Sequence, residues 1–271
     1  GDNRKGDNLY TCSILALDVM TGKLKWHFQP TPHDEWDWDA VQPLVLVDAN
    51  WKGQPRKLLL QANRNGFLYV LDRTDGKMLL ASPMVKKLTW AKGIAPDGRP
   101  IMNPNQVPTP EGTRICPAVE GAANFFSTSY NPATRLFYVN TLERCAIYTK
   151  RPAPEWQPGR NYYGGGGQRD PQDKAQKFLR AFDIETGKVV WEIPQDGPAN
   201  TWTGTLTTAS GLVIFGDDGN SLAAADAKTG KRLWEFPLTE SLHTSPMTYQ
   251  FDGKQYVSIL NGSIVYTFGV D

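Results

Sequence analysis

The 271-residue sequence has almost no net charge, because 29 basic residues balance 28 acidic ones to give a formal charge of +1. A chain without a charge bias is not expected to bind nucleic acid or an anionic membrane surface. Its longest apolar runs are strand-sized, such as residues 44–47, so no membrane span is expected. The sequence also has no haem-attachment motif of the form CxxCH, which excludes a covalently attached haem within these residues.

The chain does not open on a basic-then-apolar leader, so no signal peptide is visible, and its first residues, GDNRKGDN, read like the interior of a longer protein. Cysteine is scarce, and the odd count of three leaves at least one unpaired within the chain. Cys12 lies in a strand-like run and is predicted to be a buried apolar filler. Cys116 and Cys145 sit beside turn-rich sequence, where spacing alone leaves a disulfide open.

Glycine (25 residues), proline (20) and tryptophan (9) are plentiful, which suits many short strands and turns rather than helices. One motif recurs: an Asp at 18, 72, 183 or 226 ends a strand-like run, and a Gly follows four positions later. Such a Gly supplies the positive φ that tight turns need. In three of the four copies a Trp follows eight positions after the Asp, and we expect it to pack between neighbouring units.

The four aspartates are separated by 54, 111 and 43 residues, and the long middle gap indicates an insertion. Repeats of about 40–50 residues with four strands each are typical of a β-propeller. We therefore predict an all-β fold in which residues 1–271 form a single partial propeller domain, with incomplete blades at both ends and an insertion at about residues 150–173. Open sheet edges favour a ring completed by further residues of this protein or by another chain.

Within the insertion, four consecutive glycines at 164–167 lack the Lys-Ser/Thr and the helix of a phosphate-binding loop. A flexible loop is the preferred interpretation.

The most chemically distinctive stretch is TPHDEWDWD at residues 31–39. In an extended chain, residues two apart share a face, so Asp37 and Asp39 would point together while Trp36 and Trp38 take the other side. Paired carboxylates can hold a hard cation or act as a general base beside one. The alternative is an acidic surface turn whose tryptophans enter the core.

The repeats and TPHDEWDWD together resemble the quinoprotein alcohol dehydrogenases, which oxidise alcohols with pyrroloquinoline quinone on an eight-bladed propeller. Four further motifs support this resemblance: GDNLY, NRNGFLYVLD, the ICP…C pair and SPMTYQFDGKQYV. The resemblance spans nearly the whole chain but corresponds to the C-terminal half of the family's catalytic domain. It therefore implies the C-terminal portion of an eight-bladed quinoprotein propeller.

The resemblance also implies roles for individual residues. Asp37 matches the family's catalytic base and lies beside the metal, and Asp39 matches the extra carboxylate ligand of the lanthanide-using branch. The metal would thus be a lanthanide or calcium ion, acting as a Lewis acid. Three further positions match residues that contact the quinone: Arg64, Asn124 and Trp202. The alternatives are a turn arginine paired with an exposed acid, a capping asparagine and a core tryptophan.

Cys116 and Cys145, 29 positions apart, look like a structural disulfide of the family, which implies the periplasm. The family's glutamate and asparagine metal ligands would lie upstream of Gly1, so these residues hold at best half a cofactor site. By analogy the substrate is a small primary alcohol, and electrons leave to a separate cytochrome c-type acceptor. The competing hypothesis is a non-catalytic propeller scaffold that binds protein partners.

Overall fold

The computed structural model describes residues 4–152, 154–200 and 202–269, which form 22 strands and no helix. Among these residues there is accordingly no helix with the length and hydropathy to cross a membrane. The strands assemble into seven separate sheets, and neighbouring strands within each sheet run antiparallel. The described residues thus have the all-β architecture that the sequence predicts.

Three sheets have four strands each in chain order, as propeller blades do. The first contains β3 (Val45–Trp51), β4 (Gln54–Ala62), β5 (Phe67–Asp72) and β6 (Met78–Pro83). The second contains β10 (Ser129–Asn131), β11 (Leu136–Glu143), β14 (Gln176–Asp183) and β15 (Val189–Gln195). The third contains β16 (Thr205–Thr207), β17 (Leu212–Asp217), β18 (Ser221–Asp226) and β19 (Arg232–Pro237).

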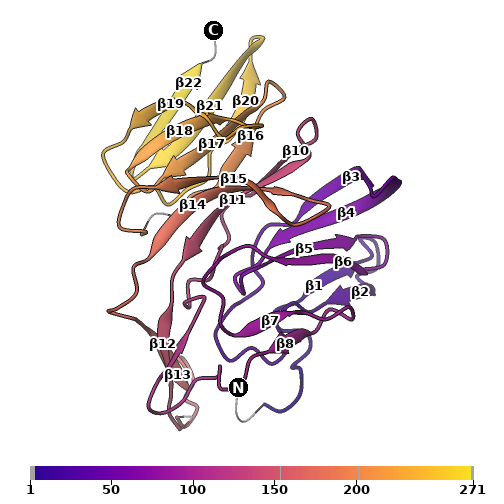
Figure 1. Cartoon of the computed structure of the whole chain (residues 1–271), viewed down its shortest axis with the longest axis vertical. Helices are drawn as coiled ribbons and strands as arrows, with labels where there is room; N and C mark the ends of the chain where they lie inside the picture. The colour runs from indigo at the N-terminus through magenta and orange to yellow at the C-terminus, as the bar shows by residue number, and fades with distance from the viewer. Residues whose placement is uncertain (1–3, 153, 201, 270–271) are drawn as a thin grey trace.

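Shorter sheets lie before and after these three. A two-stranded sheet opens the fold with β1 (Ile14–Leu17) and β2 (Leu24–Phe28), and a three-stranded sheet closes it with β20 (Met247–Phe251), β21 (Lys254–Asn261) and β22 (Ile264–Gly269). Figure 1 shows the last sheet at the top of the molecule and the first sheet beside β5 and β6, well apart from the last, as expected of an open arc of blades.

Two small sheets are built from the connections between blade strands. One pairs β7 (Ala91–Ile94) with β8 (Pro100–Met102), and the other orders β13 (Gly165–Arg169), β12 (Ala146–Lys150) and β9 (Thr113–Ile115). In Figure 1 the β12–β13 hairpin projects away from the second blade, into which it is inserted between β11 and β14.

The glycine run and Cys12 differ from their predictions. Three of the four glycines, residues 165–167, belong to β13 and pair with β12, so the flexible-loop interpretation is wrong for them. Gly165 lies directly against the Thr149 backbone, an approach that a side chain would block. Cys12 precedes β1, is only partly buried, and donates its Sγ–H to Asp34 Oδ2 at 3.4 Å, so it is not an apolar filler.

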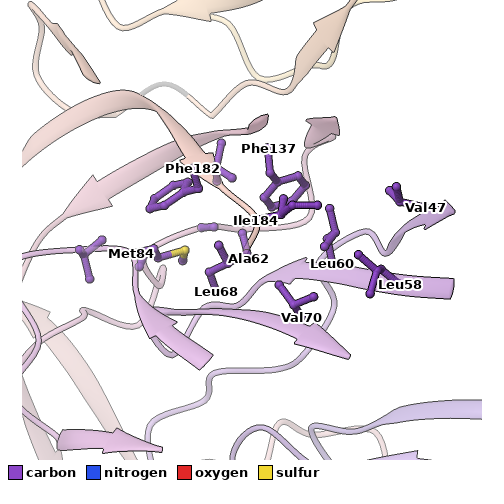
Figure 2. Packing of buried hydrophobic residues seen from close by; sticks show 14 of the residues in the cluster. Val47, Leu58, Leu60, Ala62, Leu68, Val70, Met84, Phe137, Phe182 and Ile184 are labelled. Atoms are coloured by element: carbon purple, nitrogen blue, oxygen red, sulfur yellow. The ribbon is translucent and has the colours of Figure 1, made fainter. Parts of the chain in front are cut away.

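The blades are held together by apolar side chains at their shared faces. Figure 2 shows Leu58, Leu60, Leu68 and Val70 of the first whole blade meeting Phe137 and Phe182 of the second, with Ile184 beside them. Every residue of β5 and of β11 is buried, because the middle strands of a blade have a neighbouring blade on each face. This explains their near-continuous apolar sequences, FLYVLD and LFYVNTLE.

The recurring Asp…Gly motif closes the turn between the third and fourth strands of each four-stranded blade, and the turn between β1 and β2 of the incomplete first blade. In the copies at Asp18, Asp183 and Asp226, one carboxylate oxygen accepts hydrogen bonds from two backbone N–H groups and from a threonine hydroxyl at 2.7–3.1 Å. The tryptophan of one blade then packs on the turn of the next: Trp191 Nε1 donates to the Ala227 carbonyl at 3.2 Å. The predicted packing of these tryptophans between units is thus observed.

We expect Gly230→Ala to destabilise the protein through this contact. Gly230 has a φ of 73°, and an added Cβ would lie 2.7 Å from the Trp191 ring. Gly253→Ala is the matched control, because Gly253 has a φ of 77° and open space around it. Both variants carry backbone strain, but Gly230→Ala should lose about 1–3 kcal/mol more in the free energy of unfolding, measured in urea. Equal losses would mean that the tryptophan contact does not stabilise the blade interface.

The alternating direction of the strands divides the connections between two faces. Third-to-fourth strand turns, such as residues 18–22 and 226–230, lie on one face. Connections between the second and third strands, and from one blade to the next, lie on the other. Asp37, Arg64, Asn124 and Trp202 all fall in connections of this second kind. The fold thus places every predicted site residue on a single face, which we call the site face.

Candidate active site

Residues 31–39 connect β2 to β3 and are not a strand, so the assumption of an extended chain is wrong. His33 and Asp37 have left-handed φ angles of 50° and 64°. The two tryptophans are nevertheless both buried, and their rings stack with centroids 4.8 Å apart. Trp90 packs against both rings, with centroids 5.3 Å from Trp36 and 5.2 Å from Trp38. This buried tryptophan cluster fixes the segment, while Asp37 and Asp39 remain exposed.

Asp37, Asp39 and Arg64 come together on the site face. Arg64 Nη1 lies 2.9 Å from Asp39 Oδ2, and the arginine side chain is 9% exposed against 54% for the aspartate. Partial burial raises the pKa of Asp37, the negative charge of Asp39 raises it further, and Arg64 lowers it. Two carboxylates are therefore close enough to repel each other beside one guanidinium. Arg64 lies in the turn between β4 and β5 and is paired with an exposed acid, as the alternative interpretation holds, and its side chain is buried.

Arg64 is fixed by the loop at residues 119–126, which precedes β10. Its Nη2 donates to the Val119 carbonyl, and its own carbonyl accepts from Ala122 N at 2.9 Å. Gly121, with a φ of 80°, lies so close that an added Cβ would be 2.6 Å from the Cβ and Cγ atoms of Arg64. The buried Nε of Arg64 has no hydrogen-bond partner among the described residues. Arg64 thus binds Asp39 through Nη1 and Val119 through Nη2, while its buried Nε remains unsatisfied among the described residues.

The same loop reaches the other predicted cofactor contacts. Asn124 donates its side-chain amide to the Glu120 carbonyl at 2.8 Å and accepts from Phe125 N at 2.9 Å. Phe126 stacks on Trp202, with ring centroids 6.2 Å apart and planes within 8°. Asn124 is therefore a local capping residue in this structure, and Trp202 is partly buried rather than a core residue. The loop at residues 119–126 therefore contacts both Arg64 and Trp202.

Two residues near the acidic pair were not predicted. The ligand-type atoms of Cys12, Asp34 and Asp39 lie within 4.8 Å of one another, whereas Asp37 is outside this group. Burial raises the pKa of Asp34 to about 6, against hydrogen bonds from Trp36 N and Cys12 that lower it. The HDEWD motif contains Asp34, but nothing in the local sequence indicates its contact with Cys12, 22 residues earlier.

Cys116 and Cys145 form a disulfide, with Cα atoms 4.3 Å apart, as the family resemblance implies. It joins the end of β9 to the start of β12 and so closes the base of the inserted sheet. The buried face of that sheet contacts the acidic segment, since Tyr148 of β12 packs edge-on against Trp38 at 6.5 Å. The insertion therefore stands directly beside the candidate site.

Comparison with known proteins identifies the family. Residues 1–93 and 193–257 match the family described as PQQ: Glucose/ethanol/alcohol dehydrogenase, beta-propeller domain, where PQQ is pyrroloquinoline quinone. The chain belongs to this quinoprotein family. The quinoprotein prediction and the β-propeller prediction are both confirmed by this match.

Matches to individual proteins support the same family. The chain is 41% identical over 268 residues to the quinoprotein alcohol dehydrogenase PedH of Pseudomonas putida, covering 96% of this chain and 44% of that protein. It is 35% identical over 274 residues to the lanthanide-dependent methanol dehydrogenase of Methylorubrum extorquens, covering 96% and 45%. Among solved structures, a europium-containing methanol dehydrogenase superposes with a TM-score of 0.86 at 36% identity, covering 95% of this chain and 46% of that one. The chain thus spans less than half the length of these relatives.

Proposed function

We propose that this chain forms part of a quinoprotein that oxidises primary alcohols to aldehydes, with Asp37 as the base. The observation that supports it most directly is the convergence of Asp37, Asp39 and Arg64 on the site face, beside a loop that also positions Asn124 and Trp202. The relatives named as alcohol and methanol dehydrogenases give the reaction class.

The residues present fit a bound cation and quinone. Mutual repulsion of two carboxylates is relieved by a cation, and the unsatisfied Arg64 Nε is a donor suited to a quinone oxygen. Asp37 and Asp39 would hold the metal, and Arg64, Asn124 and Trp202 would contact the quinone. When bound, the quinone would accept the hydride, which carries both electrons of the oxidation, and a calcium or lanthanide ion would polarise its carbonyl as a Lewis acid.

Within this scheme the protein's own groups have distinct tasks. The Asp37 carboxylate takes the hydroxyl proton of the alcohol, and a neighbouring cation keeps that carboxylate ionised. The Arg64 guanidinium supplies fixed positive charge where negative charge develops on reduction. Its place is set by Val119 and Gly121, so little reorganisation is needed during the reaction.

Electrons are proposed to leave to a separate cytochrome c-type acceptor. Relatives are named as a 1-butanol dehydrogenase (cytochrome c) of Thauera butanivorans and a methanol dehydrogenase [cytochrome c] subunit 1 of Paracoccus denitrificans. The Cys116–Cys145 disulfide supports a proposed periplasmic location, because disulfides persist in oxidising compartments. The remaining part of the propeller is proposed to come from further residues of the same protein or from a second chain.

Metal-linked stability tests the proposal against a non-catalytic scaffold. In the complete protein, lanthanum or calcium with the quinone should raise the unfolding temperature, since a ligand at a hundred times its Kd stabilises by about 2.7 kcal/mol. The double variant Asp37→Asn/Asp39→Asn should abolish the increase. Magnesium is the control ion, because it demands a smaller octahedral site. A scaffold would show no such increase, and an increase that survives in the double variant would place the metal elsewhere.

A further inference from the structure

Lys177 is a buried lysine that the proposed mechanism does not use. It lies near the start of β14, paired with Leu142 of β11 and Gln195 of β15, and it is 2% exposed. Lysine is rarely buried to this extent without a partner. The position is on the site-face end of the strand, immediately after the inserted hairpin.

The partner given by the structure is the indole of Trp202. Lys177 Nζ lies 4.3 Å from the centroid of that ring, well within the range of a cation–π contact. Two charged groups act on the amine: Asp218, from the β17–β18 connection, and Arg144, from the β11–β12 connection. Its strand neighbours Leu142 and Gln195 are uncharged. Burial lowers the pKa of Lys177 to about 7, Arg144 lowers it as well, and Asp218 raises it.

Trp202 has a second partner that belongs to the candidate site. Its ring stacks on Phe126, two residues after Asn124 in the loop that also binds Arg64. Trp202 N donates to the Leu242 carbonyl at 3.1 Å, which fixes the backbone but not the ring. The orientation of the indole is therefore set by Phe126 and Lys177 together.

We infer that Lys177 is a positioning residue, whose ammonium holds the Trp202 indole against the Asn124 loop and supplies positive charge to that side of the quinone site. The role towards the quinone rests on the proposed function, whereas the contact between Lys177 and the indole is observed in the structure. Because a cation–π contact is lost when the amine is neutral, the state of Lys177 determines how firmly the ring is held.

The first test needs no cofactor. Tryptophan emission of the wild-type protein should change with a midpoint near pH 7, as Lys177 loses its proton beside the indole. The change should disappear in Lys177→Met and in Trp202→Phe, and the double variant should behave like either single one. Absence of any such transition in the wild type up to pH 10.5, the ordinary pKa of lysine, would overturn the inference, as would its persistence in Lys177→Met. The wild-type titration gives this answer even if Lys177→Met does not fold.

Lys52→Met is the matched control. Lys52 Nζ lies 5.8 Å over the Trp51 ring, but Lys52 is exposed and belongs to the β3–β4 turn on the opposite face. This variant removes a lysine–tryptophan pair without touching the site, and it should leave the transition near pH 7 intact. Loss of the transition in Lys52→Met would assign it to the Lys52–Trp51 pair and contradict the assignment to Lys177 and Trp202.

Stability gives a second readout that does not depend on fluorescence. The pKa of Lys177 falls from 10.5 to about 7 on folding, so between these values the unfolded state binds more protons. The stability of the wild type relative to Lys177→Met should therefore increase as the pH rises from 7 to 10. If the difference in the free energy of unfolding between the two proteins stays constant over this range, folding does not lower the pKa of Lys177.

The third test uses the complete protein and the quinone. Lys177→Met should bind the quinone about tenfold more weakly and lower its midpoint potential, with the KM for alcohol unchanged. Lys177→Arg keeps the charge and should recover part of the loss. If the wild type binds no quinone, the proposed function fails while the pH titration still decides the Lys177–Trp202 contact. If the titration succeeds but quinone affinity and potential are unchanged in Lys177→Met, the role towards the cofactor is overturned.

Discussion

Asp37→Asn is expected to lower kcat of the complete, reconstituted protein about a thousandfold, because general-base catalysis contributes roughly 10²–10⁴-fold. The substitution removes the negative charge and the basicity of the side chain and keeps its size. The KM for alcohol should change little, since the variant affects proton transfer rather than substrate binding. The measurement is dye reduction by ethanol or methanol with saturating quinone and metal.

Asparagine is the substitution of choice because Asp37 has a φ of 64°. Asn and Asp both tolerate this left-handed conformation, whereas Ala would add about 1 kcal/mol or more of strain. Glu35→Gln is the matched control: Glu35 is a carboxylate two residues away that faces His33, at 4.0 Å, and it should retain full activity. Retention of more than about a tenth of the wild-type kcat in Asp37→Asn would exclude Asp37 as the base.

Asp39→Asn is expected to distinguish lanthanide from calcium. Removing one carboxylate charge should lower lanthanum-supported activity about a hundredfold and calcium-supported activity about tenfold, because affinity of oxygen sites depends on their charge count and a trivalent ion gains more from each charge. The amide oxygen can still accept from Arg64 Nη1, which lies 2.9 Å from the Asp39 carboxylate. Activity is measured after reconstitution of metal-free protein with each ion.

The control for Asp39 is Asp48→Asn. Asp48 is an exposed carboxylate paired with Arg73 at 2.6 Å, so this variant removes an aspartate–arginine pair that lies away from the site. It should leave activity with both ions unchanged. Equal losses with lanthanum and calcium in Asp39→Asn would remove the argument that Asp39 selects the metal.

The blade repeat was predictable because its determinants are local. Asp226 accepts hydrogen bonds from residues two and three positions later, and Gly230 supplies the required positive φ within the same turn. A turn that is closed by its own residues leaves a readable pattern in the sequence. The packing of Trp191 on the following blade could be predicted too, since the same spacing recurs in three copies.

The site was harder to predict because its contacts join distant segments. Arg64 meets Val119 and Gly121 through a loop more than 50 residues later, and Lys177 meets Trp202 only because two blades are adjacent. The spacing argument at residues 31–39 assumed an extended chain, which the structure does not have there. Two left-handed residues interrupt the extended chain there, and the tryptophans enter the core while Asp37 and Asp39 stay exposed, as the alternative of an acidic surface turn predicts. Resemblance to a family supplied the site residues that periodicity could not.

The division of the connections between two faces has a practical consequence. The turn at residues 18–22 has side chains that are almost entirely in solvent, with Val19 94% and Met20 87% exposed, and it lies away from the acidic segment and Arg64. A single cysteine introduced at Met20 could therefore tether the protein to a solid support with its reactive side turned towards the medium. Immobilisation through the β12–β13 hairpin would instead place the support next to the acidic segment, which Tyr148 of β12 contacts through Trp38.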